Sequence, residues 1–451
     1  MCILIEYVKN FFKKVMKKKN AINHRMRVYA PDDFYKFSTY KIDKKLSYET
    51  IKNGVVHSAI NWTSFFQKFK DTGFITDENN QWVLSSASYE KALYSRIPNE
   101  NNEFIAKTIH KKAIFLGAFR QHYGHFICQG LTRLWFLLNH KCDDYDLVYI
   151  PQGVLPDFVF KYLDLFGIDK KQLTPITETT MYDEIIVPEI SFALDRFWTK
   201  EFKDTINRIK KSISPVKNKR VYLSRLHFDD NLIGEKYIEK IFELNGYKII
   251  YPEEMSIEEQ ISVISGANDV VGVVGTALHN LMFMQDGAKC TILERNNIPN
   301  YNQIVINDMR SLNTDYVYAN NSSLPSLSGK GPYVLLITKY LQKYFDKKRI
   351  VYKEKNLKNN ANLQQTYLLA WYLMYSDEAL LDKLLKSHNN KQKDIKDYMY
   401  SLEKLYKNVE ISVVSDKILD VFKSYTVVSC CEDDKMVINT NKFIDNVNQK
   451  K

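Results

Sequence analysis

Apolar and polar positions form their clearest pattern in the stretch NDVVGVVGTALHNLMFMQDGAKCTILER. An apolar run over 270–274 leads into Gly275, a helix-like segment over 277–284 and a second β-rich run over 290–293. A strand, a glycine turn, a helix and a strand in this order form a βαβ unit. We expect Gly275 to permit a tight turn and Thr276 to cap the helix, whose first N–H groups then favour a phosphate. A βαβ unit without any ligand is the competing interpretation.

The alternation of strands and helices continues on both sides of this unit. The pattern predicts strands over 220–225 and 248–251 with a helix over 235–244 between them, and an earlier strand over 113–117 followed by a helix over 127–139. Short connections between such elements are typical of parallel, doubly wound sheets, which bind ligands at the carboxyl ends of their strands. Four candidate binding residues fall at these ends: Arg225, Glu253, Gly275 and Glu294.

With 451 residues the chain is long enough for two or three domains. A polar, proline-containing stretch over 212–219 is typical of a linker. We expect an amphipathic basic helix over 1–20, an amino-terminal α/β domain over 21–215, a carboxyl-terminal Rossmann-like domain over 216–332 and a helical region over 333–451. The helices of the last region are expected to serve packing or self-association into a homo-oligomer.

Charge limits the classes of partner. The net charge of +11 indicates contact with an anionic partner, such as a nucleotide diphosphate, an acidic lipid or a nucleic acid. Over 1–20, apolar positions share one helical face and lysines line the other, which is typical of a helix lying on an anionic membrane. A helix docked on the protein's own core is the alternative. Because the lysines concentrate there rather than among aromatics in one groove, we expect no nucleic-acid binding.

The cysteines bear on the compartment. The six cysteines show neither disulfide-framework nor zinc-site spacing, which favours a reducing environment. No stretch approaches the roughly 18 apolar residues of a membrane span. We therefore expect a cytoplasmic protein that lies peripherally on the inner face of a bacterial membrane.

Two blocks of residues carry a family resemblance. The first, HYGHFICQGLTRLW, begins at His122 and looks like an Asn-x-x-His segment with an acidic residue four positions on. The second, over 220–294, contains the strand end YLSR, the pair Pro252-Glu253, the glycine turn and the closing ILE. Together they resemble glycosyltransferase family 61 over about residues 110–325. Many bacterial members of this family build capsular or cell-surface polysaccharide. The chain departs from the family's pattern at three positions: His122 stands for Asn, Gln129 for the acidic residue, and Val274 for the His before the turn glycine.

The resemblance implies a fold and an activity. The expected fold is α/β and GT-B-like, with two Rossmann-like domains facing a cleft and a helical C-terminal appendage. The expected activity is inverting transfer of a sugar from a UDP- or CMP-sugar donor to a glycan or glycolipid acceptor of the capsule or lipopolysaccharide type. The donor is a co-substrate, and no further cofactor is required. A polysaccharide pyruvyltransferase and a non-catalytic, membrane-associated scaffold of the same fold are the alternatives.

Inverting transfer needs a base for the acceptor hydroxyl and positive charge or N–H dipoles for the leaving phosphate. We expect His125 to be the base, with His122 as the fallback and Gln129 orienting the imidazole or an acceptor hydroxyl. The alternative for His125 is a capping or packed histidine. The donor-binding residues are expected to be Arg225, Glu235, Glu253, Gly275, Thr276, His279, Asn280 and Glu294.

Several donor-site assignments have alternatives. Arg225 can clamp two phosphate oxygens or form an ion pair, and Glu294 can accept from ribose hydroxyls or pair with an arginine. His279 is expected either to help neutralise the phosphate or to face solvent. The run Asp143-Asp144-Tyr145-Asp146 mimics a metal-binding Asp-x-Asp, but it precedes a strand of the other domain. A solvated turn explains it better, and we expect no metal site.

Overall fold

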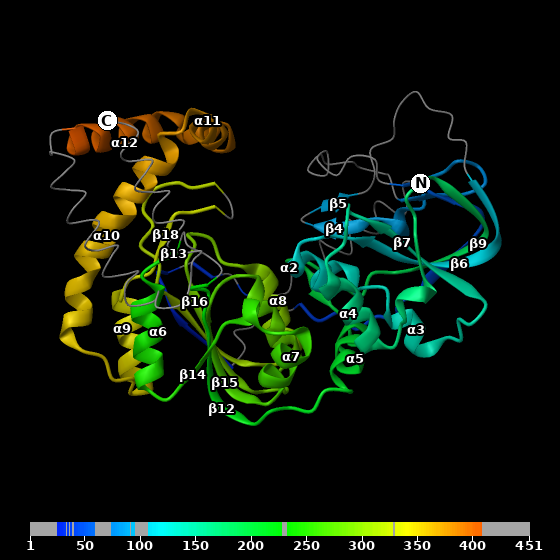
Figure 1. Cartoon of the computed structure of the whole chain (residues 1–451), viewed down its shortest axis with the longest axis horizontal. Coiled ribbons are helices and arrows are strands. Elements are labelled where there is room, and N and C mark those ends of the chain that lie inside the picture. Colours follow the sequence, from blue (N-terminus) through cyan, green and yellow to red (C-terminus); the bar gives the residue numbers. More distant parts are fainter. Residues whose placement is uncertain are drawn as a thin grey trace.

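The computed structural model describes residues 25–58, 74–94, 107–227, 232–327 and 330–407, apart from positions 33, 36, 38, 39 and 91. Two six-stranded sheets dominate this part of the chain, and a group of helices lies at its carboxyl-terminal end (Figure 1). No helix among these residues has the length and apolar character needed to cross a membrane. The basic helix predicted over 1–20 and the end of the chain after 407 lie outside the described residues.

We number the two large sheets by their order along the chain. The second sheet, formed mainly by residues 218–318, is parallel throughout. Its strands, in spatial order, are β1 (Met26–Tyr29), β17 (Asn313–Tyr318), β16 (Lys289–Glu294), β15 (Ala267–Val273), β12 (Asn218–Leu223) and β14 (Lys248–Ile250). Numbered along the chain from β12, the order is 2-1-3-4-5, which is a doubly wound arrangement. The winding reverses between β12 and β15, where Leu223 pairs with Gly272. In such sheets ligands bind at this switch point.

Helices cover both faces of this second sheet, because its strands are apolar on both sides. They are α6 (Glu235–Leu244), α7 (Ile257–Ser265), the 3₁₀ helix η6 (Thr276–Phe283), α8 (Tyr301–Met309) and α9 (Lys339–Lys348). On one face α6 and α9 pack against Tyr222 and Val271, and on the other α7, η6 and α8 pack against Val221 and Val270. The capping box of Ser256 and Glu259 starts α7, as its sequence pattern allows.

The first sheet, formed by strands between residues 48 and 188, contains both parallel and antiparallel pairs. In spatial order its strands are β3 (Ile75–Thr76), β2 (Tyr48–Val56), β9 (Thr180–Pro188), β6 (Lys107–Phe119), β7 (Tyr145–Pro151) and β8 (Leu173–Pro175). The strands from β9 to β8 are parallel, and β2 runs antiparallel to its neighbours. Short additional elements are η2 (Leu84–Ser86), β4 (Ser88–Glu90), β5 (Ala92–Tyr94), η4 (Lys170–Gln172), β10 (Phe192–Ala193) and β11 (Phe197–Trp198). The helices α4 (Asp157–Phe166) and α5 (Lys200–Lys210) lie between the two sheets (Figure 1).

The segment after β6 corrects the prediction of one helix over 127–139. It consists of α2 (Tyr123–His125), the π-helical turn η3 (Phe126–Gly130) and α3 (Trp135–Asn139). All five residues of η3 are buried, and a Cβ at Gly130 would lie 2.6 Å from the ring of Phe126. The predicted amphipathic helix would keep one polar face in solvent, whereas here tertiary packing buries the turn on every side and the segment is irregular.

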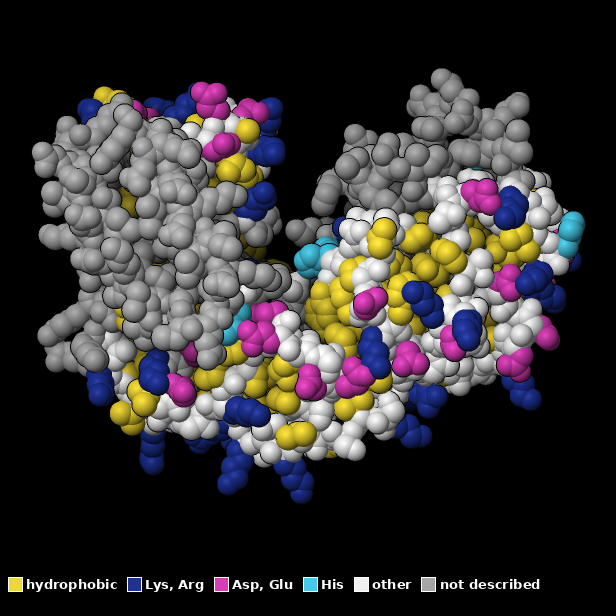
Figure 2. All heavy atoms as spheres, viewed as in Figure 1, with side chains coloured by type: hydrophobic (Ala, Val, Ile, Leu, Met, Phe, Trp, Pro, Cys, Tyr) yellow, Lys and Arg dark blue, Asp and Glu magenta, His cyan; other side chains and the backbone are white. Residues whose placement is uncertain are grey.

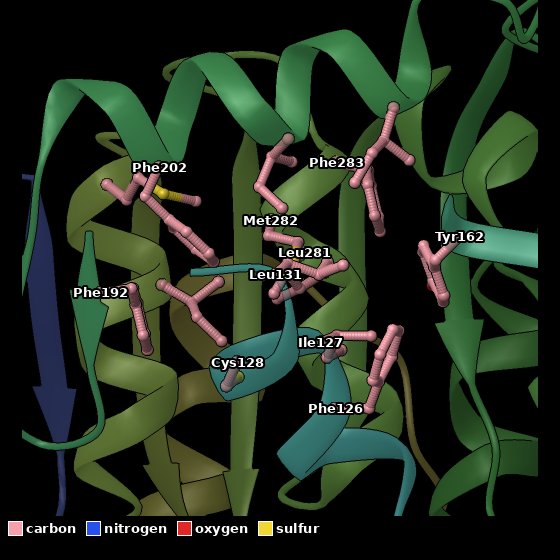
Figure 3. Packing of buried hydrophobic residues seen from close by; sticks show 14 of the residues in the cluster. Phe126, Ile127, Cys128, Leu131, Tyr162, Phe192, Phe202, Leu281, Met282 and Phe283 are labelled. Carbon is pink, nitrogen blue, oxygen red and sulfur yellow. The ribbon is translucent and has the colours of Figure 1, made fainter. Parts of the chain in front are cut away.

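A continuous apolar core joins the two sheets. Phe126, Ile127 and Cys128 of η3 lie beside Leu281 and other residues of η6 (Figure 3). The ring of Tyr162 on α4 stacks on Phe283, with centroids 6.1 Å apart. Buried apolar contact therefore holds the carboxyl edge of the first sheet against that of the second.

The amino-terminal segment also connects the sheets. β1 pairs in parallel with β17 at the edge of the second sheet, and the chain then passes to β2 in the first sheet. By its hydrogen bonds β1 thus belongs with the strands of 216–332, although the sequence places it in 21–215. Arg27 on β1 bonds to Asp315 on β17 at 2.5 and 3.0 Å, which strengthens this pairing.

The described part of the carboxyl-terminal region is mainly helical from Lys339 to Lys407, in line with the sequence pattern. It contains α10 (Glu354–Tyr375), α11 (Glu378–Ser387), η7 (Asn389–Lys391) and α12 (Gln392–Lys407). α10 packs beside the short pair β13 (Leu232–Ile233) and β18 (Tyr333–Val334). Trp371 donates from Nε1 to the carbonyl of Pro325 at 2.6 Å, and Tyr375 donates to that of Gly331 at 2.8 Å.

Candidate functional site

The switch point of the second sheet brings Arg225 and Gly275 together. Arg225 follows β12 and Gly275 follows β15, so both lie at carboxyl strand ends. A Cβ at position 275 would lie only 2.3 Å from Nη1 and 2.9 Å from Cζ of Arg225. The backbone at Gly275 is extended, with φ of 164°, so its conformation does not require glycine. Glycine is needed here because the guanidinium lies directly over the backbone.

Glu235 fixes the backbone of Arg225 by a hydrogen bond. It begins α6 and is fully buried. Its Oε1 accepts from the backbone N–H of Arg225 at 3.0 Å and from the hydroxyl of Tyr222 at 3.3 Å. Burial raises the pKa of Glu235 to about 8, and the charge of Arg225 acts against this rise. The structure therefore places this predicted donor-site residue where it positions Arg225.

Glu294 ends β16 and lies at the same edge. Its side chain is buried; Oε2 accepts from the hydroxyl of Tyr35 at 3.3 Å, and Oε1 accepts from the N–H of Asn296 at 3.4 Å. Burial raises the pKa of this carboxyl to about 8. Tyr35 is a residue that the sequence analysis missed. No local signal identifies it, because the segment after β1 reaches β16 only through the pairing of β1 at the sheet edge.

The start of η6 differs from the prediction. η6 begins at Thr276, and its N-cap is Gly275, which has no side-chain hydrogen bond to the helix. The expectation that Thr276 caps the helix is therefore wrong. The methyl group of Thr276 instead faces α2, where a Cβ at Gly124 would lie 2.6 Å from Thr276 Cγ2 and 3.1 Å from His279 Cδ2. Gly124 thus allows the two sheet edges to meet at close range.

His279 does not face solvent, so that alternative for it is wrong, whereas its expected role beside the phosphate stays a prediction. It is 4 % exposed, and its Nδ1 lies 3.0 Å from Oε1 of Gln303. Burial lowers its pKa to about 4, and the charge of His122 acts in the same direction. The imidazole is therefore neutral at pH 7, and it packs between η6 and α8.

Asn280 joins the two sheets through hydrogen bonds. Its Oδ1 accepts from the hydroxyl of Tyr123 at 2.5 Å, and its Nδ2 donates to Oε1 of Gln260 at 2.7 Å. The Tyr123 hydroxyl also lies 2.7 Å from that of Tyr162. Gln260 in turn donates to the carbonyl of Pro252 at 2.8 Å. The contacts of Asn280 are thus those of a residue that fixes α2 and α4 against α7.

His125 lies at the carboxyl edge of the first sheet, where it ends α2. Its Nδ1 is 2.8 Å from Oε1 of Gln129, to which Nη1 of Arg120 also donates at 3.4 Å. A hydrogen bond from Nδ1–H to Oε1 requires the tautomer in which Nε2 is the proton acceptor of the ring. Nη1 of Arg120 lies 3.1 Å from the same Nδ1 and can only donate, so this contact favours the other tautomer. Gln129 is buried and one helical turn away, so it orients the imidazole.

Arg120 is a second residue that the sequence analysis missed. It directly follows β6, is 7 % exposed, and places Nη1 3.1 Å from Nδ1 of His125. The signal that identified Arg225, a basic residue directly after a strand, applies to Arg120 as well. His122 is exposed, and its ring centroid lies 5.0 Å from that of His125 in an edge-to-face arrangement. Figure 2 shows histidine and acidic side chains near the base of the hollow between the two parts of the molecule.

The family described as Glycosyltransferase 61 matches residues 123–292. The match supports an assignment to glycosyltransferase family 61. The matched range runs from α2 to β16, so it includes His125, Arg225 and Gly275. It lies within the 110–325 span of the resemblance. The family supports a glycosyltransferase role in general terms. No curated protein matches the chain.

The acidic run over 143–146 lies away from the switch point. Asp146 is on β7 of the first sheet, and Lys111 contacts it at 3.2 Å. Within the part of the chain that the structure describes, no three His, Cys, Asp or Glu side chains are grouped so as to hold a metal ion. Glu253, in η5 (Pro252–Glu254) after β14, is exposed and lines a groove between α4 and α7.

Proposed function

We propose that the protein is an inverting glycosyltransferase of GT-B architecture. It would transfer a sugar from a UDP- or CMP-sugar to a growing cell-surface glycan or glycolipid of the capsule or lipopolysaccharide type. The family match supports the transferase role, and the packing of two carboxyl sheet edges against each other supports the architecture. The donor is the second substrate, and the residues described provide binding and proton transfer.

The observation that carries the proposal is the guanidinium of Arg225 over Gly275 at the switch point. A guanidinium can donate to two phosphate oxygens at once, and the first N–H groups of η6 point to the same region. This combination suits a nucleoside mono- or diphosphate leaving group. Glu294, at the neighbouring strand end, offers a carboxyl oxygen to ribose hydroxyls.

The chemical step then assigns roles to both sheet edges. Nε2 of His125 takes the proton of the acceptor hydroxyl as that oxygen forms its bond to the anomeric carbon of the donor sugar. The bond between the anomeric carbon and the phosphate oxygen breaks, and Arg225 stabilises the negative charge on the departing nucleotide. Attack on the face opposite the leaving group inverts the anomeric centre. In the tautomer in which Nδ1–H donates to Gln129, Nε2 is available to take this proton.

The proposed location is the cytoplasmic face of a bacterial membrane. The support for it is the sequence over 1–20, in which apolar and lysine-rich faces alternate with helical periodicity. Self-association through the carboxyl-terminal helices is proposed on their apolar composition alone.

The test is a thermal-shift panel of UDP, CMP, their sugar conjugates and phosphoenolpyruvate with the full chain. We expect stabilisation by uridine or cytidine nucleotides and its loss in Arg225→Ala. Transfer from each stabilising sugar nucleotide is then followed by release of the free nucleotide. Stabilisation by phosphoenolpyruvate alone would indicate the pyruvyltransferase, and binding of a donor without transfer would indicate the scaffold.

A further inference from the structure

A groove of about 720 Å³ lies between the two sheets, on the side formed by α4 and α7. One wall comes from α4 and η4, and the other from η5 and the start of α7. Lys161 on α4 forms an ion pair with Glu258 on α7, so the walls are tied to each other. The volume is in the range of small-molecule binding sites.

The charge of the groove differs from that of the chain. Five carboxylates and two lysines line it, which leaves an excess of three negative charges in a protein of net charge +11. A diphosphate is repelled by such a surface, whereas an uncharged or amine-bearing molecule is not. Asp164 is exposed at this wall, and its Oδ2 lies 3.8 Å from Nζ of Lys161, which is a long distance for an ion pair.

Aromatic rings supply the apolar part of the lining. Tyr123, Phe158 and Phe160 all border the groove and are partly exposed. Phe158 is held edge-to-face by Tyr123, with centroids 5.3 Å apart. Nζ of Lys170 lies 4.1 Å from the centroid of Phe160, a contact of modest strength at an exposed site. Ring faces beside carboxylates and an amide suit the C–H faces and hydroxyl groups of sugars.

The groove leads toward the switch point. Partial desolvation raises the pKa of Glu253, which lines the groove, and the positive charge of Arg225 acts in the opposite direction. Tyr123 borders the groove from α2, two residues before His125. The groove therefore adjoins both sheet edges of the proposed reaction centre.

We propose that this groove binds the acceptor as an uncharged or amine-bearing oligosaccharide, with Phe160 as a stacking surface and Asp164 as a hydrogen-bond acceptor. The inference rests on the proposed function and adds the acceptor class to it. The sugar units of the acceptor glycan that precede the reacting sugar occupy the space between α4 and α7. Acidic glycans, such as those rich in uronic acid, are poor occupants because of the lining charge.

The test applies the full chain to a panel of immobilised oligosaccharides in neutral, amine-bearing and uronic-acid-bearing sets. We expect retention by members of the first two sets and little by the third. Phe160→Ala should weaken retention about tenfold, the scale of one lost aromatic contact, and Asp164→Asn about threefold. Tyr400→Ala is the matched control, because Nζ of Lys404 lies 4.5 Å from the centroid of its ring, close to the 4.1 Å between Lys170 and Phe160. Asp382→Asn, on the exposed surface of α11, controls for Asp164.

Nucleotide binding separates this inference from the donor assignment. Phe160→Ala and Asp164→Asn should bind UDP and CMP as the parent does, whereas Arg225→Ala should lose nucleotide and keep the glycan. The inference is overturned if no panel member is retained, if the uronic-acid set is retained best, or if both groove variants bind glycan normally. If the parent protein binds glycan but no nucleotide, the donor proposal is wrong and the groove proposal stands.

Discussion

Replacing Gly275 with alanine should weaken nucleotide binding without unfolding the protein. The new Cβ would lie 2.3 Å from Nη1 and 2.9 Å from Cζ of Arg225. Ordinary contacts are about 3.5 Å, so the guanidinium must retreat by roughly 1 Å. The backbone at this position is extended and accepts alanine without strain. The atoms that must move belong to the end of a flexible side chain, so the sheet itself is left in place.

The size of the effect follows from the contact that is displaced. A hydrogen bond to a charged group contributes about 1.5–3 kcal/mol, and a bidentate one depends strongly on position. With about 1.4 kcal/mol for each factor of ten, nucleotide affinity should fall by roughly 10- to 150-fold. Arg225→Ala should fall in the same range, because both changes remove the same phosphate contact.

Calorimetry measures the affinity for UDP and CMP directly. It is applied to the parent protein, to both single variants and to the double variant. In the Arg225→Ala background the added alanine at 275 meets no guanidinium, so the second change should cost little further affinity. Circular dichroism checks the fold of each variant. The reasoning is refuted if a folded Gly275→Ala variant binds nucleotide as the parent does, or if the two losses add.

Three other outcomes are expected. His125→Ala should keep the fold and nucleotide binding but lower turnover by about 10²–10⁴, and His122→Ala should cost less; near-normal turnover in the first variant would make His125 structural. Glu235, with a pKa raised from 4.5 to about 8, holds a proton in the folded state that the unfolded chain loses above pH 4.5. The free energy of unfolding should therefore fall as the pH rises from 4.5 to 8. In urea titrations the Glu235→Gln variant should lose less of this free energy over the same interval, and an equal loss would show that other groups dominate. Deleting residues 1–20 should abolish salt-sensitive co-sedimentation with anionic vesicles, whereas an unchanged pellet or an unfolded product would assign that segment to the core.

Local pattern was sufficient for the strand ends of the second sheet. Apolar runs followed by Arg225, Gly275 and Glu294 place these residues at carboxyl ends whatever the strand order is, because a parallel sheet aligns all such ends at one edge. The α/β class and the helical carboxyl-terminal region were also predictable, since periodicity is a property of neighbouring residues. Arg120 could have been found in the same way.

Long-range pairing and burial determined the rest. The order 2-1-3-4-5, which brings Arg225 over Gly275, depends on which strands pair and leaves no periodic trace in any one of them. The same is true of β1, whose pairing with β17 carries Tyr35 to Glu294. His279 has the composition of a charged helix-start residue, but packing between η6 and α8 removes it from water and keeps it neutral. The charge state of a side chain depends on its solvation, and solvation is known only once the chain has folded.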